Sequence, residues 1–242
     1  MHRSIPGIVL MCLFGCSSAP EPKEEATIPS APEVTEPRSW TGYYSGSSSI
    51  GDGTVEEVAM WVRADSTFIL QRKIIGQDSV PTGTFGRWHD ATNVLELGTG
   101  ETLAARYTQG ENGSLRSHPE LPGQPVSVLD KFADALGDAV PHMRVSGTYV
   151  LADDAQSFKP CGSTYTWPCV GGMDTGEEDG ESLNPFTNED MLKAYRKAVK
   201  KDGDTWEVMV ICTLGMGPAM EGTGTDEYLF IESVTGDSHG CP

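Results

Sequence analysis

The chain has 242 residues, of which 17 are basic and 35 are acidic, and its formal net charge is −18. This balance argues against nucleic acid and anionic membrane headgroups as partners, because both are bound through basic patches. With 38% hydrophobic residues the chain can bury a core, and the ~200 residues after its N-terminal tail correspond to one large or two small domains.

The first fifteen residues have the composition of an export signal. A short basic start precedes an apolar run from Ile8 to Phe14, which is shorter than the ~20 residues of a transmembrane helix and fits a secretory signal. The run ends in Leu13-Phe14-Gly15-Cys16. This ending resembles the lipobox of bacterial lipoproteins, in which the cysteine is lipidated and becomes the mature N-terminus. We expect a signal peptide over 1–15 and a lipid on Cys16; the alternative is an ordinary cleaved signal.

A lipid on Cys16 has consequences for compartment and redox state. The exported chain enters an oxidising space, where its other cysteines are expected to form disulfides. Acyl chains rather than a transmembrane helix then hold it on a membrane. Ser17 follows the cysteine, and by resemblance to the sorting rule of enteric bacteria this favours the outer membrane, facing the periplasm. Residues 16–39 are rich in Pro and Glu and predict an extended, disordered linker.

Residues 40–126 read as one domain of short antiparallel strands. Apolar residues at Val58, Met60 and Val62 recur every second position, which is typical of a half-buried strand. The Ser- and Gly-rich stretch 47–54 is expected to be a loop, and further short strands are separated by turn residues. Regular strands without helices predict a meander that closes into a barrel and so removes its edges.

A connector over 127–144 follows. Leu129, Phe132, Ala133 and Leu136 lie at helical spacing, and Pro141 ends the run. This pattern predicts a short helix or turn that joins two domains.

Residues 145–242 read as a second, β-rich domain with one helix. The helix is expected to begin at the cap Thr187-Asn188-Glu189-Asp190 and to end before Gly203, with cations in its last turn. Strands are expected over 147–152, 206–214 and 227–234. The apolar stripe of the helix is formed by Met191, Leu192, Tyr195 and Val199.

Motifs from both halves carry a family resemblance. The first half contains Trp40-x-Gly42-x-Tyr44-x-Gly46 and Gly83-x-Phe85-Gly86-x-Trp88, and resembles the lipocalin-like N-terminal barrel of the NlpE copper-resistance lipoproteins. The second half contains Gly147-x-Tyr149-x-x-Ala152-Asp153, Gly217-Pro218-x-Met220-Glu221 and Gly240-Cys241, and resembles the C-terminal OB-type domain of that family. The implied fold is mainly β: a lipocalin-like meander barrel, then an OB-like barrel with one helix.

The resemblance implies a non-enzymatic protein for surface and envelope-stress sensing, linked to copper homeostasis, with a periplasmic sensor protein as partner. In that family a Cys-x-x-Cys lies in the loop after the first strand, whereas residues 47–53 of this chain contain no cysteine. Two adjacent thiolates are what allows a small loop to hold Cu(I) or to cycle as a dithiol. We therefore expect no copper or redox role for this loop, and no cofactor.

Four cysteines remain beyond Cys16 and the signal: Cys161, Cys169, Cys212 and Cys241. Four cysteines allow three pairings. The resemblance implies a bridge between Cys161 and Cys241, which leaves Cys169 with Cys212. The alternative is a four-thiolate zinc site, which the absence of a Cys-x-x-Cys argues against.

The other candidates are weaker. His89, His118, His142 and His239 are scattered, and we expect no metal ligands among them. Met209, Met216 and Met220 could offer thioethers to Cu(I), but core or loop methionines are the default. No nucleophile elbow, phosphate loop or dinucleotide fingerprint indicates an enzyme. The competing function is a lipocalin-like module that carries a lipid or small apolar ligand in its barrel.

Overall fold

The computed structural model describes residues 39–50, 53–118, 126–133, 140–152, 155–171, 186–219, 223–237 and 241. Cys16 and the rest of the predicted signal and linker, apart from Ser39, lie outside these ranges, as do His239 and Met220. Residues from Ser39 onward belong to one compact unit. No helix among the described residues is long and apolar enough to cross a membrane.

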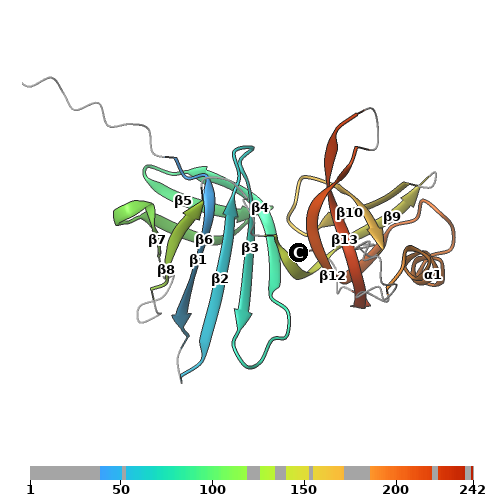
Figure 1. Ribbon diagram of the computed structural model, residues 1–242, viewed down its shortest axis with the longest axis horizontal. Coiled ribbons are helices and arrows are strands. Elements are labelled where there is room, and N and C mark those ends of the chain that lie inside the picture. Colours follow the sequence, from blue (N-terminus) through green and yellow to red (C-terminus); the bar gives the residue numbers. More distant parts are fainter. Residues whose placement is uncertain are drawn as a thin grey trace, which may run out of the picture. The chain divides into compact units, whose positions relative to one another are not determined.

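Eight strands form the first barrel (Figure 1). Each strand pairs antiparallel with the next, and β8 pairs back onto β1, so that the ring closes. A short 3-10 turn, η1 (Glu111–Gly113), precedes β7. The strands are β1 (Gly42–Ser49), β2 (Val55–Val62), β3 (Thr67–Ile74), β4 (Thr82–Asp90), β5 (Val94–Thr99), β6 (Thr102–Gln109), β7 (Leu115–Ser117) and β8 (Val128–Ala133).

Two local predictions in this region are wrong. The stretch 47–49, expected to be loop, continues β1, because Ser47, Ser48 and Ser49 pair with β2. The stretch 129–133, expected to begin a helix or turn, forms β8. Helical and strand periods are hard to tell apart in so short an apolar run. Closure decides the outcome here, because β1 would otherwise present an unpaired edge.

Five strands and one helix form the second barrel (Figure 1). Its pairings run β9-β10-β11-β13-β12 and return to β9, and only the β11–β13 pairing is parallel. The predicted fold class, mainly β with two barrels and one α-helix, is confirmed, while the OB-type label of the second barrel stays a prediction. The elements are β9 (His142–Ala152), β10 (Ala155–Pro160), β11 (Trp167–Gly171), α1 (Asn188–Ala198), β12 (Trp206–Pro218) and β13 (Thr225–Asp237).

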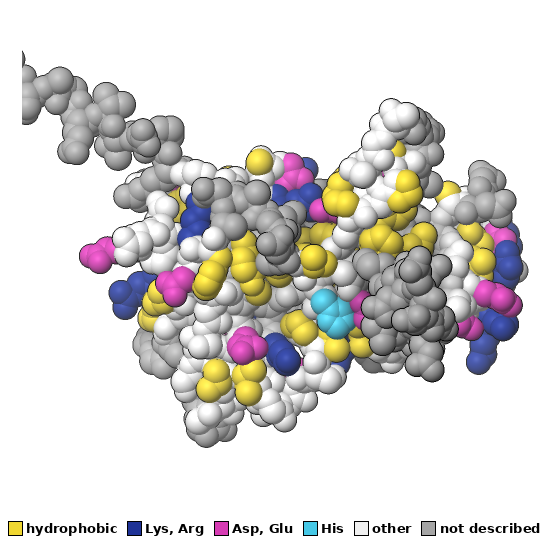
Figure 2. Space-filling model, viewed as in Figure 1, with side chains coloured by type: hydrophobic (Ala, Val, Ile, Leu, Met, Phe, Trp, Pro, Cys, Tyr) yellow, Lys and Arg dark blue, Asp and Glu magenta, His cyan; other side chains and the backbone are white. Residues whose placement is uncertain are grey.

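Helix α1 begins at the predicted cap. The Thr187 side chain accepts from the backbone N–H of Asp190, and the Asp190 carboxylate accepts from the backbone N–H of Thr187, which completes a capping box. Met191 and Tyr195 are buried against the second barrel. Basic and acidic side chains lie interspersed over the outer side of the helix (Figure 2), and Lys193 pairs with Glu189 at 3.6 Å.

The two barrels share a hydrophobic core. Trp61, Ile69 and Phe85 point outward from the first barrel and belong to the same buried cluster as the interior of the second. Phe85 lies 5.3 Å from Trp167, measured between ring centroids. Thr82 of β4 pairs in parallel with Arg144 of β9, which joins the strands of both barrels into one continuous sheet.

A polar network supports the same contact. Glu227 Oε2 accepts from Arg63 Nη1 at 2.9 Å and from Trp167 Nε1 at 2.8 Å. The Gln71 side chain donates to the carbonyl oxygen of His142 at 3.1 Å. These side chains are mostly shielded from water, so the hydrogen bonds fix the orientation of the residues that meet there.

Candidate functional site

A disulfide joins Cys161 to Cys241, with 5.1 Å between the Cα atoms. Cys161 directly follows β10, and its backbone N–H donates to the carbonyl oxygen of Ser146 at 2.9 Å. The bridge closes a loop of 80 residues, which in the chain-entropy model stabilises the fold by ~4 kcal/mol. Cys161 is half-buried and Cys241 is exposed. This bridge is therefore open to reagents from the solvent.

The other two cysteines are free and buried. The bridge expected between Cys169 and Cys212 is not present: Cys169 lies on β11 and Cys212 on β12, and β13 runs between them. Two strand spacings of ~4.8 Å exceed the Cα separation that a disulfide spans. Burial raises the pKa of both thiols, and the neighbouring Cys212 raises the pKa of Cys169 further. Both cysteines therefore stay neutral and unreactive at physiological pH.

Next to the disulfide, Gly162 forms a contact turn with Cys161. Gly162 has φ of +78°, and a Cβ built on it would lie 2.7 Å from the carbonyl oxygen of Phe85 and 2.9 Å from Thr99 Cβ. Only glycine fits both the left-handed conformation and the approach to the first barrel. The contact turn therefore carries the disulfide directly to the place where the barrels meet.

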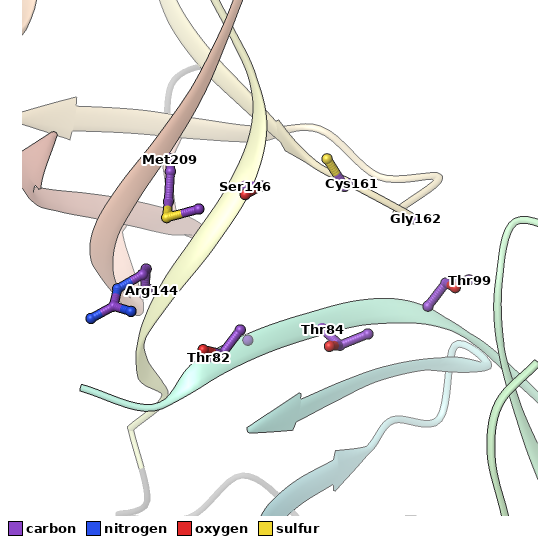
Figure 3. A pocket seen from close by; sticks show the side chains of 9 residues that line it. Thr82, Thr84, Thr99, Arg144, Ser146, Cys161, Gly162 and Met209 are labelled. Carbon is purple, nitrogen blue, oxygen red and sulfur yellow. The ribbon is translucent and has the colours of Figure 1, made fainter. Parts of the chain in front are cut away.

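A cavity of about 280 Å³ opens beside this turn, between β4, β9 and β12 (Figure 3). Arg144 lies at one end of it and Cys161 at the other, with Met209 on β12 between them. The Arg144 side chain has no hydrogen-bond or ion-pair partner within the part of the chain that the structure describes. Hydroxyl groups make up most of the remaining lining, from Thr82, Thr84, Thr99 and Ser146.

This lining has a definite chemical preference. The described lining residues include one cation and four hydroxyl groups but no carboxylate, so the cavity suits a small polar or anionic group. Met209 offers a single thioether without a cysteine thiolate or histidine beside it in the lining. No group of three or more His, Cys, Asp or Glu side chains within the described ranges is placed to hold a metal ion.

The remaining sequence candidates are dispersed. His89 contacts Glu96 at 2.8 Å and His142 contacts Glu232 at 3.0 Å, both as exposed histidines beside a carboxylate. Met216 is largely exposed at the end of β12. Arg144 was missed from the sequence, because nothing in the alternating strand around it indicates which outward side chains face the other barrel.

Comparisons with known proteins do not assign the chain to a family. No family model matches the chain. No curated protein matches it either. Among solved structures, it is similar to the crystal structure of the Cpx pathway activator NlpE from Escherichia coli, with 14% sequence identity and a TM-score of 0.31 over 80% of this chain and 93% of that chain. A superposition of this extent carries no argument about function.

Proposed function

We propose that this chain is a non-enzymatic envelope lipoprotein, anchored in the outer membrane through Cys16 and facing the periplasm, that reports surface and envelope stress to a periplasmic sensor protein. Its export signal and lipobox-like ending supply the anchor. The observation that carries the proposal is the placement of the Cys161–Cys241 bridge at the contact between the two barrels.

The mechanism is a redox-dependent contact. A reducing dithiol breaks the S–S bond, leaves two thiols on the chain and is itself oxidised to a disulfide. Once the bridge is open, Cys241 no longer fixes the contact turn, and Gly162 is free to leave Phe85 and Thr99 of the first barrel. The sensor protein then meets a first barrel whose outer surface is changed. A disulfide oxidant reverses the process: it exchanges with the two thiols, re-forms the Cys161–Cys241 bond and is itself reduced to a dithiol.

Copper enters this proposal only indirectly. Residues 47–53 contain no cysteine pair, and a Cu(I) site of useful affinity requires soft ligands held close together. We expect calorimetric titration with Cu(I) to give no tight binding. A copper effect in cells would then arise through oxidation of thiols in the envelope.

The test combines chemistry and signalling. Mass spectrometry of the native N-terminal peptide is expected to show acylation, which is lost in Cys16→Ala. An envelope-stress reporter is then compared between cells that express the wild type and the double variant Cys161→Ser/Cys241→Ser, at equal protein levels. We expect the double variant to alter the response, whereas the matched control Cys169→Ala/Cys212→Ala leaves it unchanged. Equal responses from all three proteins would contradict the proposal.

A further inference from the structure

The side chains that face the interior of the first barrel change from apolar to charged along its strands. Inward-facing positions on β2 and β3 are apolar at the level where Met60 pairs with Leu70. One pair further along, Val58 lies opposite Arg72, and beyond it Glu56 pairs with Ser48 of β1. This end of the barrel is the lower end in Figure 1, where the β1 and β3 arrows finish and β2 begins. We call it the barrel mouth.

A cavity of about 480 Å³ occupies the barrel mouth. Its volume lies within the range of small-molecule sites in proteins. Its apolar lining comes from Ile50, Val58, Leu103, Ala104 and Ala105. Its polar lining comes from Ser48, Glu56, Arg72, Arg106, Tyr107, Ser117, His118 and Ser127. The cavity is therefore suited to a ligand that has both apolar and charged groups.

One buried hydroxyl in this cavity has no hydrogen-bond partner among the described residues. Tyr44, Tyr149 and Tyr195 are fully buried, and each donates a hydrogen bond, to Trp40, Gln156 and Asp204 respectively. Tyr107 is just as buried, with 2% of its surface exposed, yet within the described part of the chain its hydroxyl has no hydrogen-bond partner. Buried polar groups are almost always paired in native proteins, so an unpaired one indicates a missing partner.

The unpaired hydroxyl lies beside two opposite charges. Tyr107, Arg72 and Glu56 line the same cavity. Desolvation raises the pKa of Tyr107, the Arg72 guanidinium partly offsets this shift, and the Glu56 carboxylate adds to it. Arg72 Nη1 and Glu56 Oε2 are 3.7 Å apart. That distance exceeds a hydrogen bond, which leaves the donors of Arg72 and the acceptors of Glu56 available to a third group.

We propose that the barrel mouth binds a small zwitterion of the α-amino acid class with an apolar side chain. The ligand carboxylate accepts hydrogen bonds from the Tyr107 hydroxyl and from the Arg72 guanidinium. The ligand ammonium, on the neighbouring carbon, donates to the Glu56 carboxylate. The apolar side chain of the ligand packs on Val58, Leu103 and Ala105. A neutral lipid would leave the buried Tyr107 hydroxyl without a hydrogen-bond partner, which argues against it as occupant.

The proposal does not depend on the redox mechanism, because the barrel mouth and the disulfide lie on different parts of the chain. Calorimetry and amide chemical shifts of the full chain are measured with L-leucine as the probe. Leucinamide, which lacks the carboxylate, and N-acetyl-leucine, which lacks the ammonium, serve as matched ligands. We expect L-leucine to shift amides of the barrel mouth and to bind at least tenfold more tightly than either analogue.

Two kinds of variant separate binding from folding. Tyr107→Phe removes only the unpaired hydroxyl, so it should keep the stability of the protein and weaken L-leucine binding by about tenfold. Tyr44→Phe, the control, removes a paired hydroxyl and should lower stability without changing binding. Arg72→Gln and Glu56→Gln each weaken binding through one charge. The proposal is overturned by absence of any shift with L-leucine, by equal binding of N-acetyl-leucine, or by unchanged binding to Tyr107→Phe.

Discussion

At the rim of the second barrel, Cys161 and Cys241 are joined and reachable from solvent, whereas in its core Cys169 and Cys212 are free, buried and separated by β13. The four side chains are chemically identical, and only their surroundings differ. Burial raises the pKa of the core thiols and keeps them neutral, while the rim pair can exchange with external thiols. The fold thus confines redox chemistry to the place where the barrels meet.

The largest expected effect comes from removing the rim bridge. Cys161→Ser/Cys241→Ser should lower the free energy of unfolding by ~4 kcal/mol, because the unfolded chain regains the freedom of an 80-residue loop. Urea unfolding followed by tryptophan fluorescence measures the change. Wild-type protein with dithiothreitol should unfold at the same urea concentration as the double variant, and an unchanged midpoint would contradict a structural role for the bridge.

A smaller loss is expected when the contact turn is obstructed. Gly162→Ala should destabilise the protein by ~3 kcal/mol, since the new Cβ meets the backbone of Phe85 and the residue keeps a left-handed φ. Gly203→Ala is the control, because Gly203 also has a positive φ but no atom lies within 4 Å of the point that its Cβ would occupy. It should cost only ~1 kcal/mol. Equal losses of stability for the two variants in thermal unfolding would show that the close approach to Phe85 does not affect stability.

For the two core cysteines, the polarity of the substituted side chain should determine the loss of stability, because neither cysteine forms a disulfide. Cys212→Ser puts a hydroxyl without a partner into a fully buried position and should cost ~2 kcal/mol. Cys212→Ala introduces no polar group and should cost less. Labelling with a maleimide gives a second measurement: the core thiols of the wild type should react only after unfolding. Rapid labelling of the native protein would mean that the maleimide reaches the core thiols without unfolding.

The smallest effect should come from the cap of helix α1, whose hydrogen bonds are exposed to solvent. Hydrogen bonds from Thr187 hold the pKa of the Asp190 carboxyl below its ordinary value. Such a carboxyl stabilises the fold above its unfolded-state pKa and loses that contribution as pH falls through the folded value. Thr187→Ala should therefore lower the melting temperature slightly at pH 7, with the difference shrinking below about pH 4. A difference of the same size in acid would exclude the Asp190 carboxylate as a contributor, because the bond from the Asp190 N–H to Thr187 Oγ1 does not depend on pH.

The sequence predicted these regions unequally well. Alternation at Val58, Met60 and Val62 and the cap before α1 are local signals, and they identified strands and helix correctly. Strand β8 was missed because its role depends on closing against β1, far away in the chain. The position of Glu56 in the barrel mouth could have been predicted from the sequence, because every second residue back from Met60 faces inward and the count reaches Glu56. The cavity at Arg144 had none, because it depends on which strands of the two barrels meet.

Closure of the first barrel also bears on how the protein folds. Strand β1 can complete its pairing only when β8 arrives, so Tyr43 must find Ala133 across most of the domain. Pairings of such long range slow folding, and until they form, the open side of β1 can recruit strands of other chains. We infer that the interval between emergence of β1 and arrival of β8 is when this protein is most prone to aggregate.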